Sequence, residues 1–226
     1  MAELRVRARR EGDLLSAHEL ERLTAPELRR LLEGGLTTVI VPFGSVEGQD
    51  GHLPLGADSL LADLVGREAA ARLDALLAPT VRVGCAHEHL GLNGTLSVEA
   101  ETLTDTAVAL AESLARLGFT LIVLLSTHGG NVQALHRAVA RLNNLGSAAR
   151  TCAPRGDVGP DPGSHSGKWL TSVMLAHYPD LVDLPAASAT LRDELQDADA
   201  QRGAANFERF VSSIVDQITA HRSRAR

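Results

Sequence analysis

The sequence predicts an α/β fold in which a mostly parallel central sheet is covered by helices on both faces. Two short runs, TTVIVPF at 37–43 and FTLIVLL at 119–125, are almost wholly apolar and carry β-branched residues, as buried parallel strands do. The segments between such runs repeat apolar residues at helical spacing. Strands and helices therefore alternate, and the 226 residues are expected to form a single domain over 1–226.

The first half of the chain begins with a predicted helix at 20–32. Leucines repeat there at helical spacing, with Thr24 as the cap, Pro26 in the first turn and Glu27 as the capping-box carboxylate. The elements that follow are a strand at 37–43, a loop rich in glycine and charged residues at 44–58, a helix at 59–76 and a strand at 78–83.

The second half continues the alternation. Thr102 is expected to cap a helix with leucine and alanine along one face, and Gly118 is expected to end it. The elements that follow are the strand at 119–125, a helix to about residue 145, a short strand at 147–152, and helices at 171–177 and 207–221.

The composition excludes several classes of function. Hydrophobic residues make up 44% of the chain and charged residues 22%, which is ordinary for a folded globular protein. The net charge of -6 argues against a surface built for nucleic acid. No apolar run reaches the roughly 20 residues that cross a bilayer, and two cysteines, Cys85 and Cys152, do not indicate a disulfide framework. We therefore expect a cytoplasmic protein without nucleic-acid or membrane partners.

Residues suited to metal binding gather in the loop after the first predicted strand. Glu47, Gln49, Asp50, His52 and Asp58 lie within twelve residues, and carboxylate oxygens with a neutral imidazole are typical ligands of catalytic zinc or manganese. Because ligands bind beyond the carboxyl ends of parallel strands, this loop lies where a site is expected. From composition alone, an ordinary solvated loop is the more common explanation, although the glycines at 44, 48, 51 and 56 favour a tight conformation that aims side chains inward.

Two further loops carry histidines at expected strand ends or helix starts. His128 precedes Gly129 and Gly130, whose backbone N–H groups could approach an anion, although a tight turn with a surface histidine explains the pattern as well. His165 could carry protons near neutral pH or simply lie in a loop. The nucleophile motif GxSxG is absent, so water activated by a metal is the simplest nucleophile.

Taken in order, these segments resemble the creatininase (creatinine amidohydrolase) family over about residues 36–184. The stretch PFGSVEGQDGHLPLGAD at 42–58 is similar to the family pattern Gly-Ser-x-Glu-Gln-His-Gly-x-His-Leu-Pro-Leu-Gly-Thr-Asp. Three further stretches support the resemblance: HEHLGLNGTLSVEA at 87–100, THGGN at 127–131 and HSGKWLTSVMLAHYPDLVDL at 165–184.

The resemblance implies a three-layer α/β/α sandwich, a homo-oligomer, and a two-metal centre that hydrolyses C–N bonds. By this resemblance Glu47 and His128 hold one metal, Asp58 bridges to a second, and His165 moves protons to the leaving nitrogen. The remaining residues expected around the substrate are His52, His89, Gly129, Gly130, Asn131 and Ser166.

The chain departs from the family pattern at the second metal. The family histidine two residues after the glutamate falls on Gln49, whose neutral amide oxygen donates weakly. The two positions that carry a carboxylate in relatives fall on Leu170 and Gly130. The sequence therefore predicts one divalent metal per chain, with zinc preferred and manganese or iron as alternatives, or a remodelled site in which Asp50 replaces a ligand.

The predicted function is a metal-dependent amidohydrolase that cleaves an amide, cyclic amide or formamide bond of a small molecule by metal-activated water. The alternative is a catalytically impaired creatininase-like protein that binds a small molecule or a partner through the same pocket. The survival of Glu47, Asp58 and His128 together favours the enzyme.

Overall fold

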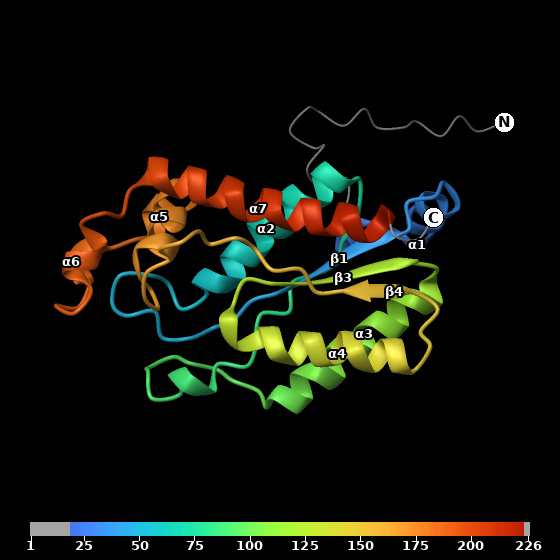
Figure 1. The fold of residues 1–226 in the computed structure, drawn as a ribbon, viewed down its shortest axis with the longest axis horizontal. Coiled ribbons are helices and arrows are strands. Elements are labelled where there is room, and N and C mark those ends of the chain that lie inside the picture. Colours follow the sequence, from blue (N-terminus) through green and yellow to red (C-terminus); the bar gives the residue numbers. More distant parts are fainter. Residues whose placement is uncertain (1–18, 224–226) are drawn as a thin grey trace.

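The computed structural model describes residues 19–223, and at its centre lies a sheet of four parallel strands in the order β2-β1-β3-β4 (Figure 1). The strands are β1 (Thr38–Phe43), β2 (Leu76–Leu77), β3 (Leu121–Ser126) and β4 (Arg150–Cys152). The predicted strands at 37–43 and 119–125 are the central pair, aligned from Thr38 opposite Leu121 to Phe43 opposite Ser126. Both strands therefore end at the same edge of the sheet.

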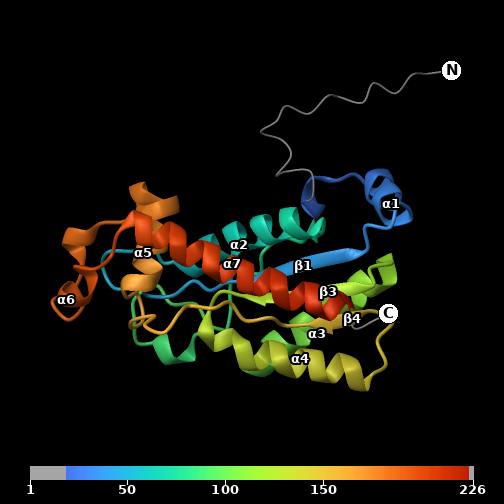
Figure 2. The ribbon, with the colours of Figure 1, turned by 45° about the horizontal axis from the view of Figure 1, so that its top comes forward.

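Helices cover both faces of this sheet and give a three-layer α/β/α sandwich, as predicted (Figure 1, Figure 2). The helices are α1 (Ala25–Glu33), α2 (Ala57–Leu73), α3 (Ala100–Leu117), α4 (Val132–Asn144), α5 (Lys168–His177), α6 (Arg192–Leu195) and α7 (Ala200–Ser223). Helices α3 and α4 lie on one face, and α2, α5 and α7 lie on the other. No helix in the described part of the chain is long and apolar enough to cross a membrane.

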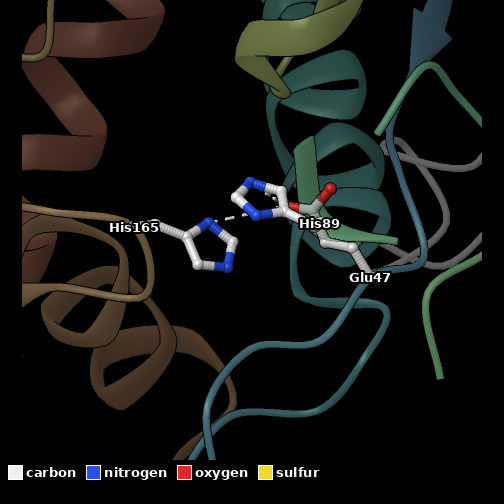
Figure 3. A group of neighbouring side chains, drawn as sticks. All are labelled: Glu47, His89 and His165. Carbon is white, nitrogen blue, oxygen red and sulfur yellow. Dashed lines mark ion pairs between the residues drawn. The ribbon is translucent and has the colours of Figure 1, made fainter. Parts of the chain in front are cut away.

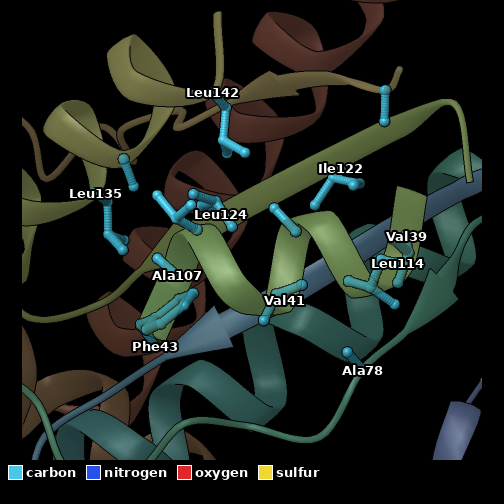
Figure 4. Packing of buried hydrophobic residues seen from close by; sticks show 14 of the residues in the cluster. Val39, Val41, Phe43, Ala78, Ala107, Leu114, Ile122, Leu124, Leu135 and Leu142 are labelled. Atoms are coloured by element: carbon cyan, nitrogen blue, oxygen red, sulfur yellow. The ribbon is translucent and has the colours of Figure 1, made fainter. Parts of the chain in front are cut away.

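The alternation of side chains along β1 and β3 produces two separate cores. Val39, Val41 and Phe43 face α3 and α4 together with Ile122 and Leu124 (Figure 4). The intervening residues of β3 pack against α2 and α7 instead. Because successive side chains of a strand point to opposite faces, two continuously apolar strands fill both cores.

The second strand differs from its prediction. A strand was expected at 78–83, whereas β2 covers only Leu76–Leu77. Beyond β2 the chain still follows β1, since the Ala78 N–H donates to the Ile40 carbonyl and the Val81 N–H donates to the Pro42 carbonyl. From Ala78 to Val81 the chain advances three residues, while the partner carbonyls in β1, those of Ile40 and Pro42, are two residues apart. Pro79 also has no N–H to donate, so the regular pairing with β1 ends there.

Helix starts agree with the sequence at α1 and differ at α3. Residues 20–22 form a separate 3-10 turn, and α1 begins at Ala25, with the predicted capping box between Thr24 and Glu27 in place. Helix α3 begins at Ala100 with Glu99 as its N-cap, so the expected cap at Thr102 was wrong. Thr102 lies inside the first turn of α3, two residues after its start, and is not at the N-cap position.

Candidate metal centre

The three predicted metal ligands meet beyond the carboxyl ends of the two central strands. Glu47 lies in the loop after β1, Asp58 in the first turn of α2, and His128 directly after β3. Their exposed fractions are 1%, 6% and 5%, and one ligand atom from each lies within 4.8 Å of the others. Residues up to 81 positions apart in the sequence therefore form one buried group of two carboxylates and an imidazole.

A backbone carbonyl fixes the proton on the His128 ring. His128 Nε2 lies 3.0 Å from the Cys85 carbonyl oxygen, which can only accept a hydrogen bond, so this nitrogen carries the hydrogen. In the neutral ring, Nδ1 then keeps its lone pair, and it lies 3.3 Å from Glu47 Oε2. Glu47 Oε2 is buried without a hydrogen-bond partner, so a lone pair and an unpartnered carboxylate oxygen face the same space.

Asp58 is held by hydroxyl and amide donors. Ser45 Oγ donates to Asp58 Oδ2 over 3.1 Å, and the Thr127 hydroxyl donates to the Asp58 main-chain carbonyl over 2.8 Å. Burial raises the pKa of Asp58 well above its ordinary value, and the negative charge of Glu47 raises it further. A cation between the two carboxylates would offset both effects.

Gln49 lies between the two carboxylates and is completely buried. Its Nε2 donates to Asp58 Oδ2 over 2.8 Å and lies 3.3 Å from Glu47 Oε1. Its Oε1 accepts a hydrogen bond from Ser166 Oγ over 2.9 Å. The amide group therefore presents hydrogens, not a lone pair, to the carboxylates.

Two histidines approach the other oxygen of Glu47 (Figure 3). His89 Nε2 lies 3.9 Å and His165 Nδ1 3.7 Å from Glu47 Oε1, and the two rings stack with centroids 3.9 Å apart. His165 Nε2 lies 2.8 Å from the Gly48 carbonyl oxygen, so it donates there and leaves Nδ1 facing the site. Burial lowers the pKa of His89, and neighbouring His165 lowers it further, which favours the neutral ring.

Within residues 19–223 the structure contains two groups with metal-ligand spacing, and both include Glu47. One joins Glu47 to Asp58 and His128, and the other joins it to His89 and His165. Both groups open into a cavity of about 320 Å³ at the carboxyl edge of the sheet. Further predicted residues on its wall are Gly129, Gly130 and Ser166.

The structure places His52 and Asn131 behind this cavity, although the family resemblance implied that they surround the substrate. His52 is 1% exposed, and its Nε2 hydrogen-bonds the Thr171 hydroxyl over 2.9 Å. Asn131 is completely buried, accepts from the Cys85 N–H and donates to the Gly44 carbonyl. Asn131 thereby joins the loop after β1 to the loop that contains His89.

The residues at the second-metal positions offer no replacement ligand. Asp50 accepts from the Ser188 N–H over 2.7 Å and belongs to neither ligand group, so this arrangement gives no support to the remodelled site with Asp50. A Cβ atom on Gly130 would collide with the Cys85 carbonyl oxygen. Leu170 lines the cavity with an apolar side chain.

Some residues of the site were not singled out from the sequence. These residues are Ser45 and Thr127, which hold Asp58 through its side chain and its main-chain carbonyl. Ser45 belongs to the Gly-Ser-x-Glu pattern at 44–47, which was a usable signal. The carbonyls of Gly48 and Cys85 carry no side-chain signal, because any residue type supplies a carbonyl.

Comparisons with known proteins show which family the chain resembles. The family model for creatininase, described as creatinine amidohydrolase, matches residues 21–215. A mycofactocin precursor peptide peptidase of Mycobacterium tuberculosis is 38% identical over 148 residues, which is 61% of this chain and 57% of that protein. The chain thus matches less than two thirds of the length of that relative.

A creatinine amidohydrolase of Pseudomonas putida is 29% identical over 189 residues, which is 72% of each protein. Among solved structures, a mutant creatininase described as a zinc–zinc type superimposes with a TM-score of 0.76 at 25% identity. That superposition covers 90% of this chain and 97% of the other. The likeness therefore extends beyond the motifs to the whole sandwich.

Proposed function

The chain belongs to the creatininase family, and on this premise we propose that it is a metal-dependent hydrolase of an amide, cyclic amide or formamide C–N bond. The observation that carries the proposal is the convergence of Glu47, Asp58 and His128 on one wall of the cavity. The two relatives described above are named as a peptidase and an amidohydrolase, and both names denote cleavage of a C–N bond.

The donor set suits a divalent transition metal. Two carboxylates and one imidazole leave room for water or substrate in a tetrahedral zinc site, and manganese or iron are alternatives with the same ligands. The unpartnered Glu47 Oε2 and the lone pair on His128 Nδ1 fit this assignment. Such a cation would supply Lewis acidity to the substrate carbonyl and would make water a better nucleophile near neutral pH.

We propose that the site is built for one cation, not two. The Gln49 amide directs its N–H groups at Glu47 and Asp58. Because N–H hydrogens carry partial positive charge, this arrangement disfavours a second cation beside Gln49. A ligand side chain at Gly130 has no space, and Leu170 has no donor atom. Glu47, Asp58 and His128 are then the complete protein ligand set.

His165 is proposed as the acid–base group. Its Nε2–H is occupied by the Gly48 carbonyl, so the proton is exchanged at Nδ1, which faces the cavity near Glu47. From there it can take a proton from attacking water and deliver it to the leaving nitrogen. The ring of His89 stacks on that of His165 and holds it in place. Gly129 and Gly130 lie just before the N-terminus of α4, where backbone N–H groups and the positive end of the helix dipole can stabilise a developing oxyanion.

The cellular context stays a prediction of the sequence. Cys85 and Cys152 are free thiols, which suits a reducing cytoplasmic location. Assembly into a homo-oligomer is implied by the family resemblance alone.

Metal analysis with a matched pair of variants tests the proposal. We expect purified protein to hold about one zinc, manganese or iron per chain and to hydrolyse members of an amide and formamide panel. Glu47→Ala should lose both the metal and the activity, because it removes a buried ligand oxygen. Glu88→Ala is the control, since Glu88 also lines the cavity but lies outside both ligand groups.

Two outcomes would contradict these proposals. If the protein holds no transition metal and binds a small molecule equally well after Glu47→Ala, the hydrolase proposal fails and the catalytically impaired binding protein replaces it. If it holds two metals and His89→Ala removes one of them, the second cation lies at the Glu47, His89 and His165 group, and the one-metal proposal fails.

A further inference from the structure

A second cavity lies beside the metal cavity because β4 is short. Strand β4 pairs with β3 only as far as Cys152 opposite Val123, so the last part of β3 runs past the edge of its neighbour. The Arg150 N–H donates to the Thr120 carbonyl, and the same alternation brings position 154 opposite the Leu124 carbonyl. Pro154 stands at that position and has no N–H to donate, so pairing stops there.

The space beyond β4 is a partly open cavity with a mostly apolar lining. Its volume is about 130 Å³, and its floor is formed by Leu124 and Leu135, which are 0% and 1% exposed. Val132, Val158 and Phe210 close the sides, from α4, the loop after β4 and α7. For scale, a wholly apolar engineered cavity of about 150 Å³ binds benzene, whereas the lining here also includes Ser126, His136 and Arg155. This side cavity is therefore large enough for a branched aliphatic group or a single ring.

The side cavity adjoins the metal cavity, with which it shares lining residues. Thr127, His128 and Gly129 line both, as do Val158 and Phe210 on the opposite wall. His128 is one of the proposed metal ligands, so a substrate whose carbonyl lies at the metal can extend a neighbouring group directly into the side cavity. No side chain of the described residues fills this space.

We propose that the side cavity binds an apolar side chain of the substrate, next to the C–N bond that is cleaved. This inference rests on the proposed function and narrows its substrate class. The substrate is then an amide of an amino-acid residue with a leucine-like or phenylalanine-like side chain, in preference to a small polar amide. Burial of that side chain against Leu124, Val132 and Phe210 supplies the selectivity.

Binding of a graded series of amides tests the inference. The probes are the N-acetyl amides of glycine, alanine, leucine and phenylalanine, titrated into the zinc-loaded full chain and followed by ligand-observed NMR. We expect the leucine probe to bind roughly tenfold or more tightly than the glycine probe, because each methylene group removed from water adds about fourfold.

Two substitutions in α4 locate the effect. Val132→Phe fills the side cavity without touching the metal cavity and should abolish the preference for leucine over glycine. Gln133→Phe is the matched control, since it adds the same ring at an exposed neighbouring position and should leave the preference intact. Val132→Ala enlarges the cavity and should shift the preference from leucine toward phenylalanine, which keeps the test valid if Val132→Phe fails to fold.

The outcomes distinguish this inference from the proposed function. Equal binding of the four probes overturns the inference, as does a preference that survives in folded Val132→Phe or that is unchanged by Val132→Ala. Metal-dependent hydrolysis without side-chain preference also overturns it and leaves the proposed function in place. A leucine preference without hydrolysis of any amide supports the side cavity and counts against the proposed function.

Discussion

Two buried carboxylates, Glu47 and Asp58, share one wall of the cavity and repel each other when both are ionised. The chain offsets this repulsion with hydrogen-bond donors, because the Gln49 amide donates to Asp58 and approaches Glu47, and Ser45 donates to Asp58. Such contacts stabilise the ionised forms without adding a full positive charge. Gln49 therefore takes the place of a family metal ligand as a hydrogen-bond donor to the two carboxylates.

Restoring the family ligands should restore a second metal. Gln49→His supplies an imidazole but no carboxylate, and Leu170→Glu supplies a carboxylate from the cavity wall but no imidazole. We expect each single variant to hold about one metal per chain and the double variant to hold about two, measured by elemental analysis of purified protein. A double variant that stays at one metal would show that these positions do not define the second site.

Asn131 should matter for stability more than for catalysis. Asn131→Ala leaves the Cys85 N–H and the Gly44 carbonyl without their partner in a buried region. We expect a loss of about 2 kcal/mol in the free energy of unfolding, since unsatisfied buried polar groups cost this much. Urea denaturation measures the change. A loss below about 0.5 kcal/mol would contradict the inference that Asn131 holds the loop after β1 to the loop that contains His89.

At the scale of elements, local sequence signals succeed where the interaction is itself local. The capping box at α1 lies within four residues, so it can be predicted from Thr24 and Glu27 in the sequence. The start of α3 is different, because Thr102 has the chemistry of a cap while the chain enters the helix two residues before Thr102. A cap residue is useful only where the backbone turns into the helix.

Paired substitutions check this distinction between the two threonines. Thr24→Ala removes the hydroxyl that faces Glu27 in the capping box and should lower the free energy of unfolding by about 1 kcal/mol. Thr102→Ala removes an exposed hydroxyl inside a helix and should change it by less than about 0.5 kcal/mol. Thermal and urea unfolding of both variants supply the comparison, and equal losses would refute the assignment of the caps.

At the scale of the whole molecule, the C-terminal helix α7 completes the second core and is joined to α2 across it. Phe210, Val211 and Ile214 of α7 are buried with Val65 and Ala69 of α2. On the surface above them, the guanidinium of Arg72 binds both carboxylate oxygens of Glu208. This contact spans 136 positions of sequence and ties the last helix to the first half of the chain.

The Arg72–Glu208 pair should make stability depend on acid pH. Arg72, with help from Ser212, lowers the pKa of Glu208 from 4.5 to about 2. A carboxylic acid whose pKa is lower in the folded than in the unfolded chain stabilises the folded chain above pH 4.5, and this stabilisation is lost as the pH falls toward 2. Glu208→Gln should therefore be less stable than the wild type at pH 6, with the difference vanishing near pH 2, in urea titrations. The effect is small because the pair is exposed.

Most of the fold could be predicted because its signals are local or periodic. The two central strands, the helices between them and the sandwich of layers follow from apolar runs and helical spacing. The length of β2 could not be predicted in this way, because it depends on how the segment with Pro79 aligns with β1. Strand ends are fixed by hydrogen bonds to a neighbour that is distant in sequence.

By itself, the sequence determined the fold class and the residue types of the site, since Glu47, Asp58 and His128 follow strands that end at one sheet edge. Only the tertiary structure decided which neighbours these residues meet. In the folded chain the Gln49 N–H groups point at the carboxylates, and His52 and Asn131 are buried away from the cavity. The side cavity beyond Pro154 likewise exists only once the segments are packed together. Local preferences fix how a segment folds, whereas side-chain contacts depend on packing between segments far apart in the chain.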